Sequence, residues 1–61
     1  MMLFQIEKGS KQKLFEIYLN ATNREHKTRD LGNKVIFSVK RPQFTQDEVL
    51  LNMFFNELVT L

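Results

Sequence analysis

His26 is the only histidine of the chain and the first residue to consider for acid-base or metal chemistry. It lies in a charged segment that runs from Arg24 to Asp30. A catalytic base needs an orienting partner and a pocket, and a metal site needs several convergent ligands. The residues around His26 show neither, so we expect a solvated loop histidine without a catalytic or metal-binding role.

No other side chain belongs to a recognisable catalytic or cofactor motif. The chain has no cysteine, which excludes disulfide frameworks, thiolate metal sites and cysteine nucleophiles. Ser10 and Ser38 lack the signature of an activated nucleophile, and neither Gly9 nor Gly32 begins a phosphate-binding loop. We therefore predict that the protein is not an enzyme, with no catalytic, cofactor-binding or metal-binding residue, no cofactor and no small-molecule substrate.

Lysine and arginine are concentrated in the first two thirds of the chain. Residues 1–41 carry all nine bases and four acids, a net charge of +5, whereas residues 42–61 carry three acids and no base. Such bases could contact nucleic-acid phosphates, and β-ribbon proteins place strands in a DNA groove. The competing interpretation is a solvated loop balanced by Glu25 and Asp30. The candidate nucleic-acid contacts are Arg24, Lys27, Arg29, Lys34, Lys40 and Arg41.

The most regular pattern predicts a helix over residues 46–60. Thr45 and Glu48 fit a capping box, and Phe44 and Val49 fit a hydrophobic staple. The paired carboxylates at Asp47 and Glu48 also suit the positive end of a helix dipole. One broad apolar face follows at helical spacing. It consists of Leu50, Leu51, Phe54, Phe55, Leu58 and Leu61.

Two further segments read as strands. Residues 34–40 are β-branched and aromatic, and alternation points Val35, Phe37 and Val39 to one face. Residues 30–33 form a plausible turn before this strand. Residues 2–7 are the second candidate, with Phe4 and Ile6 facing inward.

Residues 13–21 fit two structures. As a strand, they point Phe15, Ile17, Leu19 and Ala21 inward, after a hairpin loop over residues 8–12. As a helix, they place Leu14, Ile17, Tyr18 and Ala21 on one face, with Ser10 as a cap. The strand is the favoured interpretation, and it makes residues 22–30 a long loop.

The resulting fold is a single α+β domain over residues 1–61. We predict a three-stranded antiparallel β-meander with one C-terminal α-helix packed on one face (βββα), and βαβα is the alternative. A chain of 61 residues buries a small core, so oligomerisation is an ordinary way to gain stability. The predicted core is Phe4, Ile6, Phe15, Ile17, Leu19, Val35, Phe37, Val39, Leu50, Leu51, Phe54, Phe55, Leu58 and Leu61.

Apolar residues outside this core predict a protein interface. In the meander, Leu3, Leu14, Tyr18 and Ile36 share the outer face of the sheet, and Met53 lies off the main face of the helix. Grouped apolar residues on the surface of a small domain mark interaction sites. We therefore expect a non-enzymatic interaction module, accessory or inhibitory in role, that binds a protein partner or a second copy of itself. A DNA-binding β-sheet domain is the alternative function.

Apolar runs in the chain are too short to span a bilayer, and no basic flank precedes them as in a signal peptide. The sequence therefore predicts a cytoplasmic protein without a membrane partner.

Overall fold

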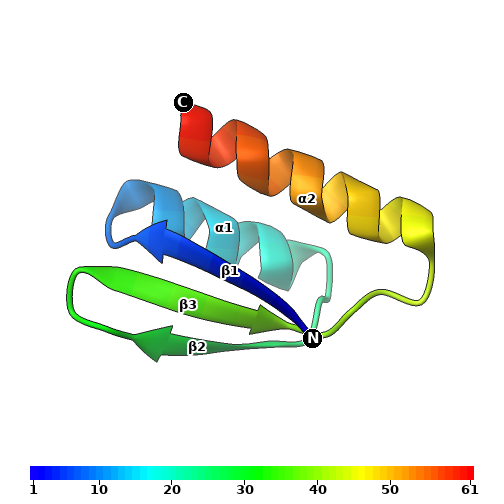
Figure 1. Cartoon of the computed structure of the whole chain (residues 1–61), viewed down its shortest axis with the longest axis horizontal. Helices are drawn as coiled ribbons and strands as arrows, with labels where there is room; N and C mark the ends of the chain where they lie inside the picture. Colours follow the sequence, from blue (N-terminus) through cyan, green and yellow to red (C-terminus); the bar gives the residue numbers. More distant parts are fainter.

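Three antiparallel strands form one sheet in the order β1-β3-β2, and two helices pack on one of its faces (Figure 1). The computed structural model describes residues 1–61. Because β3 runs antiparallel to both neighbours, β1 and β2 are parallel to each other and are joined through α1. The elements are β1 (Met2–Glu7), α1 (Ser10–Ala21), β2 (His26–Asp30), β3 (Lys34–Val39) and α2 (Thr45–Thr60).

The predicted βββα meander is wrong, although the α+β class is correct. Residues 10–21, which we interpreted as a loop and a strand, form helix α1, and part of the predicted loop 22–30 forms strand β2. The alternative βαβα order also fails, because it lacks β2. The strand predictions at 2–7 and 34–40 and the helix prediction at 46–60 are confirmed within one residue.

Helix α1 forms because Phe15 and Leu19, one turn apart, reach the core together, and both are fully buried. It ends in a Schellman motif at Asn23, whose φ of 55° lies in the left-handed region that asparagine tolerates. The Arg24 amide donates to the Leu19 carbonyl at 2.9 Å, and the Asn23 amide donates to the Asn20 carbonyl at 3.1 Å. These bonds satisfy carbonyls that the helix end would leave without partners.

Strand β2 consists of polar residues, and its extended conformation is stabilised by pairing with β3. Thr28 lies opposite Phe37, and Lys27 and Arg29 lie opposite Ser38 and Ile36. At the turn of this hairpin, the Asp30 carboxylate accepts a hydrogen bond from the Gly32 amide at 2.7 Å. As an edge strand whose residues after His26 are all exposed, β2 needs no apolar pattern of its own.

Ten residues make the core, and Phe15 lies at its centre. The Phe15 ring packs against those of Phe4, Phe37 and Phe55, with centroids 5.0–5.3 Å apart. The buried residues are Met2, Phe4, Ile6, Phe15, Leu19, Val35, Phe37, Val39, Leu51 and Leu58. Phe54 and Phe55 pack against them half-buried.

Three predicted core residues lie outside the core. Ile17, Leu50 and Leu61 are 63%, 55% and 85% exposed. Ile17 shares a face with the buried Phe15 and Leu19 only if residues 13–21 are a strand. In helix α1 it lies about 160° away from Leu19 around the axis, which turns it to solvent.

Helix α2 begins one residue earlier than the predicted capping box requires. Its N-cap is Phe44, and no side chain caps the helix. Glu48 forms an ion pair with Arg41 instead of reaching back to Thr45. Phe44 and Val49 are each at least half exposed, so the predicted staple is not formed.

Thr45→Ala is accordingly expected to change the free energy of unfolding by less than about 0.5 kcal/mol, the usual range for a surface substitution away from special features. Urea denaturation followed by circular dichroism measures this change. A loss of about 1 kcal/mol, typical of a lost hydroxyl cap, would show that Thr45 caps α2 in solution.

Neither helix combines the length and the apolar composition that crossing a bilayer requires.

Candidate functional site

The five predicted interface residues fall on two surfaces. Leu3 and Ile36 lie on the outer face of the sheet, where Leu3 pairs with Ser38 and Ile36 pairs with Gln5. Leu14, Tyr18 and Met53 belong to the helices. Leu14 and Tyr18 reach the sheet face only in the strand interpretation of residues 13–21, so the structure does not bring the five residues together as one patch.

An apolar stripe runs along the junction between the two helices. The rings of Tyr18 and Phe54 stack across this junction with centroids 3.9 Å apart and planes 11° apart. Leu14 and Ile17 stand four residues and one residue before Tyr18, and Leu50 and Met53 stand at the same spacing before Phe54. We call these six residues the inter-helix stripe.

The inter-helix stripe faces solvent. Helical spacing places Leu14 beside both Ile17 and Tyr18, and likewise places Leu50 beside both Met53 and Phe54. The four aliphatic members are each about half exposed or more, and the two rings are half-buried. Exposed apolar side chains contiguous with a stacked aromatic pair form the kind of surface that binds another protein.

The two helices run antiparallel along this stripe. The Lys11 ammonium, in the first turn of α1, donates to the carbonyl of Leu61 at the end of α2, at 2.8 Å. Figure 1 shows the start of α1 and the end of α2 at the same side of the molecule. With Tyr18 beside Phe54, Lys13 of α1 and Glu57 of α2 lie at heights along the helix axes that differ by less than one turn.

The six candidate nucleic-acid contacts also divide into two groups. Lys27, Arg29 and Lys34 share the outer face of the sheet, because their neighbours in the strands are the inward-facing Thr28 and Val35. The other three, Arg24, Lys40 and Arg41, lie at the far end of the sheet, where α1 ends and α2 begins.

The two groups also differ in whether their side chains form ion pairs. Lys40 pairs with Glu25 at 3.7 Å, and Arg41 pairs with Glu48. No carboxylate lies within ion-pair distance of Lys27, Arg29 or Lys34.

The acid closest to the outer-face bases in sequence is held on the opposite face of the sheet. Asp30 lies opposite Val35, and its carboxylate binds the Lys8 ammonium at 2.6 Å. The hydrogen bonds from Lys8 and from the Gly32 amide lower the pKa of Asp30. The ion pair of Asp30 and Lys8 therefore stabilises the hairpin fully at pH values above the ordinary pKa of an aspartate. This stabilisation is lost as the pH falls through the lowered pKa of Asp30.

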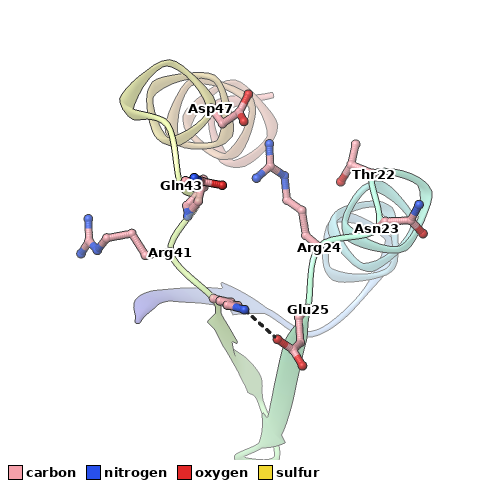
Figure 2. A pocket seen from close by; sticks show the side chains of 9 residues that line it. Thr22, Asn23, Arg24, Glu25, Arg41, Gln43 and Asp47 are labelled. Atoms are coloured by element: carbon pink, nitrogen blue, oxygen red, sulfur yellow. Dashed lines mark ion pairs between the residues drawn. The ribbon is translucent and has the colours of Figure 1, made fainter.

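The group at the end of α1 lines an open cleft of about 450 Å³ (Figure 2). Its walls carry no hydrophobic residue. Arg24 extends from the end of α1 toward Gln43, which precedes α2, and Asp47 in the first turn of α2. The Nε atom of Arg24 is buried without a hydrogen-bond partner. Because Glu25 and Asp47 offset the bases there, the charges in this cleft nearly balance.

His26 is not the loop histidine that we predicted. It is the first residue of β2, half-buried on the inner face with its ring 6.3 Å from that of Phe37. Its Nδ1 donates to the Arg24 carbonyl oxygen at 2.8 Å. No three histidine or acidic side chains come close enough together to hold a metal ion.

Sequence reasoning missed Ile17, Leu50 and Phe54 as surface residues of the stripe, because all three were assigned to the core. The helical spacing of Leu14, Ile17 and Tyr18 was the signal that could have found them. Comparison with known proteins finds no family model that matches the chain, and no curated protein or solved structure similar to it.

Proposed function

We propose that this chain is a non-enzymatic interaction module that associates with a second copy of itself through the inter-helix stripe. The observation that supports this most directly is the stripe itself, with the stacked Tyr18 and Phe54 at its centre. Central aromatic residues surrounded by aliphatic ones are the usual anchors of protein interfaces. Covering the stripe also adds buried apolar area to a domain whose own core is small.

Charge at the rim favours a second copy as the occupant. Lys13 borders the stripe on α1, and Glu57 borders it on α2. In the proposed dimer, a two-fold axis parallel to the helices makes α1 of each copy pack on α2 of the other. Because the two residues lie at similar heights along the helices, Lys13 then meets the partner's Glu57 twice in one dimer, as an isologous interface requires.

The proposed activity is therefore binding, with the dimer serving an accessory or inhibitory role by occupying the surface of a further protein. The sheet face with Leu3 and Ile36 stays uncovered in this dimer, so the two predicted apolar surfaces can be tested separately.

Sedimentation equilibrium at high micromolar concentration tests the dimer. We expect a mass of two chains for the wild type and of one chain for the double variant Ile17→Glu, Met53→Glu, because each change buries a carboxylate in an apolar interface. Val59→Glu is the control, since it adds a charge at an exposed apolar position on a different face of α2 from the stripe. A one-chain mass for the wild type, or dissociation by Leu3→Glu instead, would contradict the proposal.

Charge exchange tests the orientation of the two copies. Lys13→Glu or Glu57→Lys alone should weaken the dimer, because each sets like charges against one another. The two changes together should restore wild-type affinity. If the double variant stays as weak as the sum of the single variants, the copies do not pack with α1 over the partner's α2.

A further inference from the structure

The outer face of the β2–β3 hairpin carries three basic side chains and no acidic one, and the nearest acid across the sheet is Glu7 of β1, opposite Lys34. Lys27 and Arg29 stand two residues apart on β2, so their Cα atoms are about 7 Å apart. Lys34 lies on the same face of β3, diagonally beyond Ile36, which is the partner of Arg29. None of the three is within ion-pair distance of an acid, whereas Lys8, Lys40 and Arg41 are each paired.

This hairpin also projects beyond the helices. Thr28 and Asp30 point to the same side as the core yet are exposed, so the helix layer does not cover β2. Figure 1 shows β2 at the edge of the sheet farthest from α2. Strand β2 is therefore an exposed edge beside the central strand β3, and its residues after His26 are exposed on both faces. DNA-binding β-sheet proteins place such strands in a groove of the duplex.

We propose that the outer face of the β2–β3 hairpin binds the phosphate backbone of duplex DNA through Lys27, Arg29 and Lys34. Lysine and arginine side chains without an acidic partner neutralise phosphates and release their counterions, which favours binding without sequence specificity. The residues of β3 opposite Lys27 and Arg29 are Ser38 and Ile36, which carry no charge that would repel a phosphate. Side chains on a sheet cannot reach into the deep, narrow major groove of duplex RNA.

The composition of the outer face favours duplex over single-stranded nucleic acid. Platforms for single strands stack bases on exposed aromatic side chains. The outward-facing residues of the three strands include no aromatic. They are Leu3, Gln5, Glu7, Lys27, Arg29, Lys34, Ile36 and Ser38.

DNA binding by this face does not depend on the proposed dimer. The inter-helix stripe lies on the helix layer, and the basic face is the side of the sheet that the helices do not cover. Both surfaces can therefore be occupied at once, and each can be removed without the other.

Fluorescence anisotropy with a labelled short DNA duplex, titrated at several salt concentrations, tests the proposal. We expect the logarithm of the affinity to fall linearly with the logarithm of the salt concentration, with a slope of about −2.7 per chain for three phosphate contacts. The triple variant Lys27→Gln, Arg29→Gln, Lys34→Gln should lose this binding uniformly across duplex sequences.

The matched control changes the net charge by the same amount, at lysine and arginine side chains that already bind another group of the protein. Lys11→Gln, Lys40→Gln, Arg41→Gln should keep the wild-type slope, because these side chains hold Leu61, Glu25 and Glu48. Equal losses in the two triple variants would mean that net charge alone governs binding, and would overturn the proposal. So would no binding to the duplex, or tighter binding to single-stranded DNA, to duplex RNA or to anionic lipid vesicles.

The Ile17→Glu, Met53→Glu variant separates this proposal from the proposed function. It should bind the duplex with the wild-type slope per chain even though it is monomeric. Loss of DNA binding in this variant, with the fold intact by circular dichroism, would overturn the independence of the two surfaces.

Discussion

Phe15→Ala is expected to destabilise the fold by about 3–5 kcal/mol, the range observed when a buried phenylalanine is truncated. The Phe15 side chain is fully buried and contacts aromatic rings from β1, β3 and α2, so its removal leaves a cavity that each of these elements borders. In a domain of this size a single core rarely supplies more than about 3–5 kcal/mol of stability. We therefore expect the variant to be largely unfolded at room temperature.

Urea denaturation followed by circular dichroism checks this expectation. Phe15→Leu keeps most of the buried volume and should fold with an intermediate stability, which provides a measurable point if Phe15→Ala does not fold. Leu3→Ala is the control, because Leu3 is 71% exposed and its truncation should cost little. Similar effects for Phe15→Ala and Leu3→Ala would show that Phe15 is not at the centre of the core.

The elements that the sequence predicts correctly are those in which local pattern and tertiary packing agree. Strands β1 and β3 alternate apolar and polar residues, and every inward-facing apolar residue that alternation selects is buried. Helix α2 has a face of apolar residues at helical spacing, and Leu51 and Leu58 of that face are buried. In these segments only one secondary structure can bury the apolar residues.

Helix α1 is ambiguous from sequence because its two buried residues satisfy both periods. Phe15 and Leu19 are four residues apart, a spacing that returns to the same face of a helix and to the same face of a strand. Ile17, between them in sequence, shares their face only in a strand, and it is exposed. Asn23 was the local signal for a helix, because an asparagine in the left-handed conformation closes α1.

Strand β2 could not be predicted from its own residues, since His26–Asp30 contain no apolar side chain. Its conformation comes from pairing with β3, which is a tertiary effect. The wrong predictions for residues 10–21 and for β2 also changed the residues assigned to both candidate surfaces. Lys27 and Arg29 become neighbours of Lys34 through this pairing, and Leu14 and Tyr18 leave the sheet once residues 10–21 are helical.

Gly9 connects β1 to α1 in a conformation that a side chain disfavours. The Lys8 amide still donates to the Asn33 carbonyl at 3.1 Å in the sheet, and α1 begins at Ser10, so the chain reverses within a single residue. Gly9 has φ of 146° and ψ of −152°, a region that is essentially restricted to glycine. The sequence led us to place Gly9 in a hairpin loop, where its freedom would serve a turn between strands.

Gly9→Ala is therefore expected to cost about 1–3 kcal/mol, the usual range for a residue held in a sparsely populated backbone conformation. A Cβ at this position meets no atom within 4 Å, so backbone strain and not steric overlap sets the cost. Ser10→Ala is the control, since Ser10 is exposed and its hydroxyl makes no hydrogen bond, and it should be neutral within about 0.5 kcal/mol. Urea denaturation of the two variants makes the comparison. Because a hairpin turn between residues 8 and 12 could place an alanine at position 9 in an ordinary conformation, equal stability of Gly9→Ala and the wild type would contradict the strand-to-helix junction itself.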